Sequence, residues 1–336
     1  MKLNRRAAPH IRFPESNRTL MSDMIILLLV LCVLAFLYYG GRALIVCAVS
    51  VVTAVVCDAL CTLIRGRRPN PRDLSPVVTG LIIALTMPAT IPYYVVASAA
   101  VFAIAIVKHP FGGTGQNLFN PGAAGFSFAA ICWPGLVFMY PMPFDRIPAF
   151  GEVTAQLYQN PAFVLKVGGV PTNNLTELLF GNYPGPMGAT NILVILACLV
   201  YLIFRRTVRW QLPLPFLAAC AAVTLLFPRA GTGLQAVFYE LMSGTLLFGA
   251  VFVLTDPVTS PKRYSSMAVY GVFAGVVAML FRYFGGYEES MPFAVLIANA
   301  FVPLIDRYNE SLHRAIRRKH LEARKAKTRP QARTLV

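Results

Sequence analysis

Long apolar runs alternate with short polar segments along nearly the whole chain. A helix that crosses a membrane needs about 20 mainly apolar residues, with a range of roughly 17–25. The pattern therefore predicts an all-α polytopic membrane protein with about ten transmembrane helices. The expected ranges are 20–38, 43–64, 76–88, 92–107, 121–140, 191–204, 212–228, 236–254, 265–282 and 291–305.

The polar segments divide the chain into five parts. A basic leader at 1–19 precedes a first group of five predicted helices at 20–140. The segment 141–190 is rich in Pro, Gly and Asn, and it connects this group to a second one at 191–305. A polar, basic tail follows at 306–336.

Composition supports the membrane class. Hydrophobic residues make up 57% of the chain and charged residues only 13%, whereas soluble domains carry about 25% charged residues. The net charge of +16 is compatible with nucleic-acid binding, but no folded basic module lies between the apolar runs. Basic residues commonly flank membrane helices on the cytoplasmic side. The expected environment is therefore a lipid bilayer, and no nucleic acid is expected as a partner.

The distribution of basic residues predicts the orientation in the membrane. With the N-terminus in the cytoplasm, 25 of the 30 Lys and Arg residues fall on the cytoplasmic side and five on the other. The opposite orientation would invert this ratio and break the positive-inside rule. We therefore expect both termini in the cytoplasm, the segment 141–190 outside, and a location in the cell inner membrane.

The seven cysteines do not indicate a metal site. No CxxC pair is present, and most of the cysteines lie inside apolar runs, where Cys packs as a small hydrophobic residue. Cys57 and Cys61 share one helix face, but two thiolates leave a zinc or iron–sulfur site short of ligands. The sequence therefore predicts no bound metal.

An internal repeat relates the two groups of helices. The pattern LTxPxTxP occurs at 85–92 and again at 254–261, and Gly80 and Gly249 precede the two copies at equal distance. A repeat unit of five helices places the second copy upside down in the membrane, because five is odd. The chain is therefore expected to contain two inverted five-helix repeats.

The repeated motif predicts broken or re-entrant helix ends. Proline ends helices, and threonine can satisfy a backbone carbonyl that the break leaves free. Interruptions at matching places in two halves point to a central binding site, which makes Thr255, Asp256 and Thr259 candidate ligand-binding residues. The alternative is that both motifs are ordinary turns between helices.

A second candidate lies in the glycine-rich loop at 112–121, which leads into the fifth predicted helix. The amides of Gly112 and Gly113 and the side chains of Asn117 and Asn120 are suited to binding a polar ligand near a helix N-terminus. An ordinary helix-entry turn would use similar residues.

Asp58 lies within the second predicted helix. Acidic side chains inside a membrane are costly and are usually functional, so Asp58 is a candidate for a cation or proton relay. The alternative is a buried acid that forms hydrogen bonds between helices.

Several of these segments resemble one known family. The matching stretches are Pro9–Arg12, 75–88, 111–121, 243–261 and 284–308. They are similar to the D subunits of Rnf complexes and, more distantly, to the B subunits of sodium-pumping NADH:quinone oxidoreductases. The resemblance implies a membrane component of a translocase that couples ferredoxin oxidation and NAD reduction to Na⁺ or H⁺ movement.

The resemblance also implies covalently bound FMN. In this family the flavin phosphate is joined to a threonine in a pattern that ends Ser/Thr-Gly-Ala-Thr, with an acidic residue upstream. Here Gly188, Ala189 and Thr190 match the pattern, and Met187 and Pro184 depart from it. Thr190 is therefore the expected attachment site, modified by a flavin transferase, and a second, non-covalent flavin such as riboflavin is implied near the repeat centre. The alternative for Thr190 is a helix N-cap.

The expected role is that of an electron carrier. The chain has no GxGxxG in a βαβ context, so it is not expected to bind NAD, and no catalytic side chain is predicted. The resemblance implies the A, B, C, E and G subunits of an Rnf complex as partners. Two alternatives remain open: a passive channel or transporter for a small solute, and a divergent family member that serves an extracellular redox system.

Overall fold

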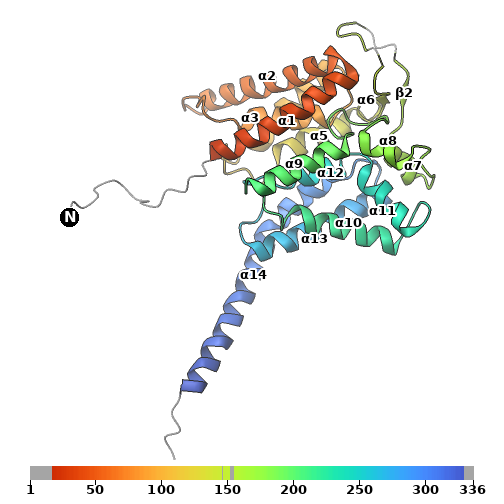
Figure 1. Ribbon diagram of the computed structural model, residues 1–336. Coiled ribbons are helices and arrows are strands. Elements are labelled where there is room, and N and C mark those ends of the chain that lie inside the picture. Colours follow the sequence, from red (N-terminus) through yellow and green to blue (C-terminus); the bar gives the residue numbers. More distant parts are fainter. Residues whose placement is uncertain (1–16, 146, 152–154, 329–336) are drawn as a thin grey trace, which may run out of the picture.

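The computed structural model describes residues 17–145, 147–151 and 155–328. It is an elongated helical bundle from which the last helix projects (Figure 1). The predicted motif at Pro9–Arg12 and the end of the tail at 329–336 lie outside the described residues.

The first group of helices follows the predicted apolar runs. It contains α1 (Asn17–Tyr39), α2 (Gly41–Ile64), α3 (Ser75–Leu85), α4 (Tyr93–Val101), the π-helix η1 (Phe102–Lys108), α5 (Pro121–Cys132) and the short α6 (Pro134–Val137). Because η1 continues α4 directly, these two segments form one apolar helix, Tyr93–Lys108.

The connecting segment 141–190 is more structured than expected. It contains the short helices α7 (Pro161–Lys166) and α8 (Leu175–Phe180), and β1 (Tyr140–Pro141) pairs antiparallel with β2 (Leu157–Tyr158). The prediction of an all-α chain is therefore wrong for these two short strands, which form a two-stranded sheet. Four residues of isolated strand give no apolar run and no alternation for sequence reasoning to detect.

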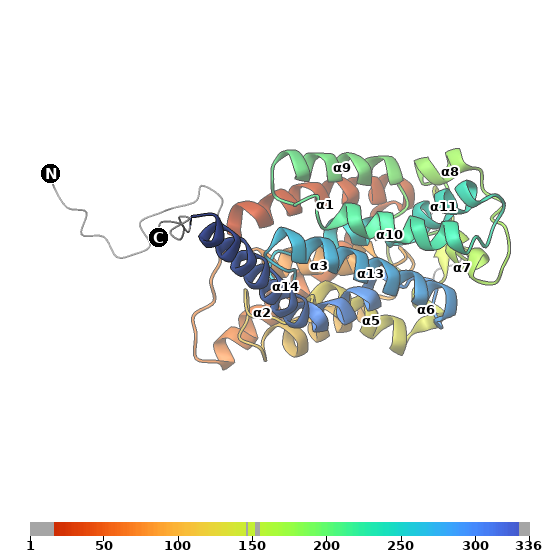
Figure 2. The ribbon, with the colours of Figure 1, turned by 90° about the horizontal axis from the view of Figure 1, so that it is seen from below.

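The second group contains α9 (Ile192–Phe204), α10 (Pro213–Leu226), α11 (Gly233–Met242), α12 (Leu246–Phe248), the π-helix η2 (Gly249–Val253), α13 (Tyr264–Phe284) and α14 (Met291–Thr328). Figure 2 shows α9, α1, α10, α13 and α5 running along the bundle, with α6, α7 and α8 gathered at one end of it.

The helices define a polytopic membrane protein. Within the described residues, four helices are long and apolar enough to cross a membrane: Arg18–Tyr39, Gly41–Ile64, Tyr264–Phe284 and Met291–Leu312. The pair Gly233–Met242 and Leu246–Val253, bent by 68°, counts as a fifth if it forms one span. The other apolar helices are shorter, namely Ser75–Leu85, Tyr93–Lys108, Pro121–Cys132, Ile192–Phe204 and Pro213–Leu226.

Three predicted ranges differ from the helices observed. The helix predicted at 121–140 ends at Cys132, since Pro134 cannot continue it. The range 236–254 is broken at Ser243–Gly244, where Gly244 adopts a φ of 69°. The range 291–305 continues as one helix to Thr328, because the basic residues that follow favour a helix even though they are polar.

The repeated motif adopts the same local structure in both halves. The Thr86 hydroxyl donates to the carbonyl of Ile82 (2.9 Å), and the Thr255 hydroxyl donates to the carbonyl of Val251 (2.5 Å). Each threonine therefore satisfies a carbonyl at the end of its helix. The bonds support the interpretation of both motifs as helix-ending devices.

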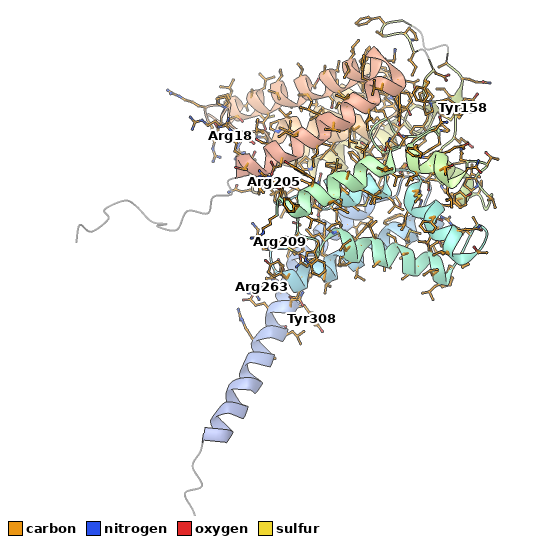
Figure 3. All side chains as sticks on the ribbon, viewed as in Figure 1. Arg18, Tyr158, Arg205, Arg209, Arg263 and Tyr308 are labelled. Carbon is orange, nitrogen blue, oxygen red and sulfur yellow. The ribbon has the colours of Figure 1, made fainter. Side chains whose placement is uncertain are left out.

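The two ends of the bundle differ in charge. Figure 3 shows Arg18, Arg205, Arg209 and Arg263 together at one end, with Tyr158 at the opposite end. We call the first the basic end and the second, which carries the segment 141–190, the loop end.

Candidate functional site

A cavity lies at the basic end, between the two groups of helices. It is lined by the first turns of α1 and α3, by the glycine-rich loop before α5 and by the end of η2 with the loop that follows it. Its free space is about 680 Å³, including the part open to solvent. Ligand pockets are commonly mainly apolar, with a few converging polar groups.

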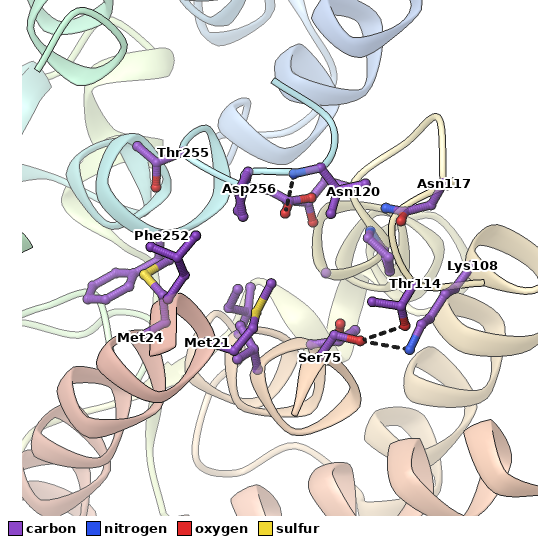
Figure 4. A pocket seen from close by; sticks show the side chains of 18 of the residues that line it. Met21, Met24, Ser75, Lys108, Thr114, Asn117, Asn120, Phe252, Thr255 and Asp256 are labelled. Atoms are coloured by element: carbon purple, nitrogen blue, oxygen red, sulfur yellow. Dashed lines mark hydrogen bonds between the residues drawn. The ribbon is translucent and has the colours of Figure 1, made fainter. Parts of the chain in front are cut away.

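The walls of this cavity differ in chemistry. Figure 4 shows Met21, Met24 and Phe252 on one side and Lys108, Thr114 and Asn117 on the other. The cavity thus presents an apolar surface opposite hydrogen-bonding side chains. Such an arrangement suits a flat, largely apolar ligand with polar edges.

Asn120 joins the two halves beside the cavity. Its Oδ1 accepts from the amide of Ala123 (3.0 Å) and so caps α5, while its Nδ2 donates to the carbonyl of Val253 in η2 (2.9 Å). Asn120 is 3% exposed. Its two hydrogen bonds hold the glycine-rich loop against η2 of the second group of helices.

Asp256 supplies the carboxylate of the cavity. Its Oδ1 accepts from the amide of Val258 (3.2 Å), and its Oδ2 accepts from the Thr259 hydroxyl (3.0 Å). Burial raises the pKa of Asp256 above its ordinary value, although both hydrogen bonds oppose the rise. Thr259 thus orients Asp256 without lining the cavity itself.

The structure separates the sequence-predicted residues into groups. Asn117, Asn120, Thr255 and Asp256 line one cavity, although they come from the two different halves of the chain. Gly112 and Gly113 line a neighbouring cavity instead. Their amides donate to the carbonyls of His109 and Lys108 respectively, so they close a turn and are not directed at a ligand.

Asp58 belongs to a charged cluster near the C-terminal end of α2. Its Oδ1 lies 2.7 Å from Lys108 Nζ and 2.9 Å from His109 Nε2. Lys108, which is 2% exposed, also lies 3.5 Å from Asp73 Oδ2. The geometry is that of a paired acid between helices, which was the alternative to a relay, and the relay remains a prediction.

Asp73 is held in its charged form. Burial raises its pKa, but Lys108 and hydrogen bonds from Thr114 and Ser75 outweigh this effect and lower the pKa overall. The cluster therefore pairs the ionised carboxylate of Asp73 with the buried Lys108. A buried charge requires such a partner.

Thr190 lies at the loop end and is 1% exposed. The N-cap of α9 is Asn191, whose Oδ1 accepts from the amide of Val194 (3.1 Å), so the alternative assignment of Thr190 as an N-cap is wrong. A Cβ added at Gly185 would lie 2.9 Å from the Thr190 methyl group. The side chain of Thr190 is therefore enclosed by the folded chain.

The Gly-Ala-Thr segment also has a structural role. The amide of Gly188 donates to the carbonyl of Leu85 (2.8 Å), and the amide of Met187 donates to the carbonyl of Met87 (3.0 Å). These carbonyls were left free where the first motif ends α3. A Cβ added at Gly188 would lie 2.5 Å from Leu85 Cβ, so only glycine permits this approach.

A buried charge network at the loop end escaped sequence reasoning. Glu240 and Arg282 are each 1% exposed. Arg229 Nη2 lies 2.7 Å from Glu240 Oε1, and Arg282 Nε lies 3.3 Å from Glu240 Oε2. Arg282 also donates to the backbone carbonyls of Glu240 and Ser243. The negative charge of Glu240 thus compensates the positive charges of two arginines in the interior.

A second acid stabilises the bend between α11 and α12. Glu289 Oε2 accepts from the amide (2.7 Å) and the hydroxyl (2.5 Å) of Thr245, and Oε1 accepts from Asn160 Nδ2 (2.8 Å). Its neighbour Glu288 is 4% exposed, and Glu288 Oε1 has no hydrogen-bond partner among the described residues. Burial, with a smaller effect of Glu289, raises the pKa of Glu288 to about 7.

Replacing Glu288 with Gln should change how stability depends on pH. Between pH 4.5 and about 7 the unfolded chain releases the Glu288 proton while the folded protein keeps it. Protonation therefore stabilises the fold fully below pH 4.5, and this contribution, about 3 kcal/mol, is lost as the pH rises through 7. As the pH rises from 4.5 to about 7, the Tm of the parent should therefore fall relative to the Tm of the Glu288→Gln variant.

This comparison isolates Glu288 from the other acids. Asp256 shifts in the same direction and Asp73 in the opposite one, but both are present in parent and variant and cancel in the difference. A difference in Tm that stays constant from pH 4.5 to 7.5 would show that Glu288 ionises at its ordinary pKa.

The fold and the cavity together define a class: a multi-pass membrane protein in which side chains from two motif-bearing halves meet in one mainly apolar cavity. The model of the NQR2, RnfD, RnfE family matches residues 4–313. The chain belongs to this family, as the resemblance of its motifs predicts.

Individual relatives match over nearly their whole length. The D subunit of the Na(+)-translocating ferredoxin:NAD(+) oxidoreductase complex of Acetobacterium woodii is 32% identical over 90% of this chain and 92% of its own length. The D subunit of the proton-translocating ferredoxin:NAD(+) oxidoreductase complex of Clostridium ljungdahlii is 29% identical over 93% and 96%. The D subunit of the ion-translocating oxidoreductase complex of Halorhodospira halophila is 31% identical over 90% and 92%.

Proposed function

We propose that the chain is the D subunit of an Rnf-type ion-translocating ferredoxin:NAD oxidoreductase, and that it carries electrons on bound flavin. The observation that carries this proposal is the cavity at the basic end, where Asn117 and Asn120 of one repeat meet Thr255 and Asp256 of the other. Its partners are then the other subunits of the complex. Relatives named for sodium and for proton translocation are similarly distant, so the coupling ion stays open.

The cavity is the proposed site of a non-covalent flavin such as riboflavin. Phe252, Met21 and Met24 would contact the apolar part of the ring system, and Asn117 and Thr114 would bind its polar edge. The flavin supplies the redox chemistry when it is bound, while the chain supplies position, exclusion of water and a fixed electrostatic environment. The half-buried Asp256 and the buried Lys108 are the charged residues that line this cavity.

A covalent FMN at Thr190, attached by a flavin transferase, is the second part of the proposal. It is supported by the match of Gly188, Ala189 and Thr190 to the family pattern. Because Thr190 is 1% exposed, the proposal includes modification before the segment 181–190 has packed against α3.

The arrangement proposed in the membrane has ten helices in two inverted repeats, with both termini in the cytoplasm and the complex in the cell inner membrane. The clustering of arginines at the basic end supports this orientation. The glycines that precede the two motifs also support two repeats. A Cβ added at Gly80 would lie 2.8 Å from Val51 Cα, and a Cβ added at Gly249 would lie 2.2 Å from Met291 Cγ. Both positions therefore allow a second helix to approach closely.

A transporter for a small solute is the competing function. The broken helix between α11 and α12 and the cavity between two halves favour it, since transporters bind their substrates in such places. A redox protein and a transporter differ in whether the purified protein retains a flavin.

The test is the flavin content of protein purified from its native host. After denaturation and removal of the polypeptide, the parent should release one non-covalent flavin, measured by fluorescence. Asn117→Ala should lower this yield by about fivefold or more, because a hydrogen bond to the ligand is lost. Gln116→Ala is the matched control, since Gln116 is exposed in the same loop and does not line the cavity.

The outcomes separate the two functions. Equal flavin release from both variants would place the flavin elsewhere in the chain. A parent protein that releases no flavin and carries none covalently would contradict the redox proposal and favour the transporter.

A further inference from the structure

A second cavity opens at the basic end, beside the cofactor cavity. Its free space is about 590 Å³, including the part open to solvent. Three arginines line it, Arg65, Arg67 and Arg68, which follow the last turn of α2. The turn at Gly112 and Gly113 forms another part of its wall.

The positive charge of this cavity is not compensated within the described chain. Its two acids are already engaged, Asp58 with Lys108 and His109, and Asp73 with Lys108. None of the three arginines forms an ion pair with a described residue. Arg65 alone is fixed, because its Nη1 donates to the carbonyl of His109 (3.1 Å). The cavity therefore offers guanidinium groups to an anion.

A buried histidine forms part of the wall of this cavity. His109 lines the cavity and is 9% exposed, and its Nε2 faces Asp58. Its Nδ1 has no hydrogen-bond partner among the described residues. Buried polar atoms in folded proteins nearly always have a partner, so this nitrogen is an exception in the wall of the cavity.

The surroundings of the arginines point to a lipid. Leu63 and Ile64, immediately before Arg65, are 56% and 84% exposed, and Phe111 is 41% exposed. Leu63 and Ile64 lie at the end of the membrane-spanning helix Gly41–Ile64, where acyl chains meet headgroups. A ligand with a phosphate and hydrocarbon chains would contact the arginines and the apolar residues together.

We propose that this cavity binds the phosphate headgroup of an anionic phospholipid from the leaflet at the basic end. Arginine suits this ligand because its planar guanidinium donates two parallel hydrogen bonds to phosphate oxygens. Basic pockets beside membrane helices on the cytoplasmic side are recognised sites for anionic headgroups. The site does not depend on the redox proposal, because it uses none of the flavin-contacting side chains named above except Thr114.

The test uses the full chain, delipidated in a neutral detergent and titrated with phosphatidylglycerol, with bound lipid counted by native mass spectrometry. The double variant Arg67→Gln/Arg68→Gln should weaken binding of the tightest lipid by about tenfold or more. The control, Arg72→Gln/Arg206→Gln, removes the same charge from two exposed arginines that do not line the cavity. It should change the affinity by less than about twofold.

Two further arms identify the source of the phosphate. Zwitterionic phosphatidylcholine should not occupy the site at the concentration that saturates it with phosphatidylglycerol. Inorganic phosphate should displace the lipid only at far higher concentration, because it lacks the contacts to Leu63 and Ile64. Equal weakening in both double variants, or full displacement by equimolar inorganic phosphate, would overturn the proposal.

Discussion

Replacing Glu240 with Ala should lower the Tm of the purified protein by roughly 10 °C, or prevent recovery of folded protein. Glu240 and Arg282 are both 1% exposed, and Glu240 also pairs with Arg229. Removing the shared carboxylate leaves two arginine charges uncompensated in the interior. Breaking a buried ion pair in this way costs about 3–5 kcal/mol, and each kcal/mol lowers Tm by about 2–4 °C in a chain of this size.

An exposed ion pair provides the control for this prediction. Glu310 lies 2.7 Å from Arg314 on the outside of α14, one helical turn away. Glu310→Ala removes the same chemical group, but water solvates the remaining arginine, so Tm should hardly change. A Glu240→Ala protein that melts within two or three degrees of the Glu310→Ala protein would show that the buried network contributes little.

The apolar pattern predicted the positions of the helices because each element depends mainly on its own residues. Helices lie in all ten predicted ranges, although only four or five are long enough to count as spans by themselves. The break between α11 and α12 depends on a distant residue. Glu289 holds the amide of Thr245 from 44 positions away, and no local signal in 236–254 reports this contact.

Part of the candidate site could also be predicted, because its residues lie in recognisable local motifs. Asp256 was selected because the motif around it breaks a helix, and Asn120 because it lies in the glycine-rich loop before α5; the structure brings both to one cavity. The burial of Thr190 was not predictable, since it accompanies hydrogen bonds from the neighbouring Gly188 and Met187 to Leu85 and Met87, which are distant in the sequence. The Arg65 cavity was missed because its basic residues were attributed wholly to membrane orientation.

Thr190→Val should abolish covalent flavin completely while leaving the fold intact. Valine keeps the methyl group that lies beside Gly185 and replaces the hydroxyl that forms the phosphoester with a second methyl group. In protein from the native host, intact mass should show FMN joined with loss of water, and the denatured band should fluoresce under ultraviolet light. Both signals should be absent from Thr190→Val and unchanged in Thr176→Ala, an exposed threonine of the same connecting segment.

The burial of Thr190 also predicts when the flavin is attached relative to folding. If the hydroxyl is reached only while the segment 181–190 is displaced, a flavin transferase should modify the chain during synthesis but not after purification in the folded state. Met187→Ser with Pro184→Asp restores the residues in which this chain departs from the family pattern, and it should raise the modified fraction in co-expression. Rapid labelling of the folded, purified protein would contradict the buried placement, whereas a parent without added flavin mass in its native host would remove Thr190 from the electron path.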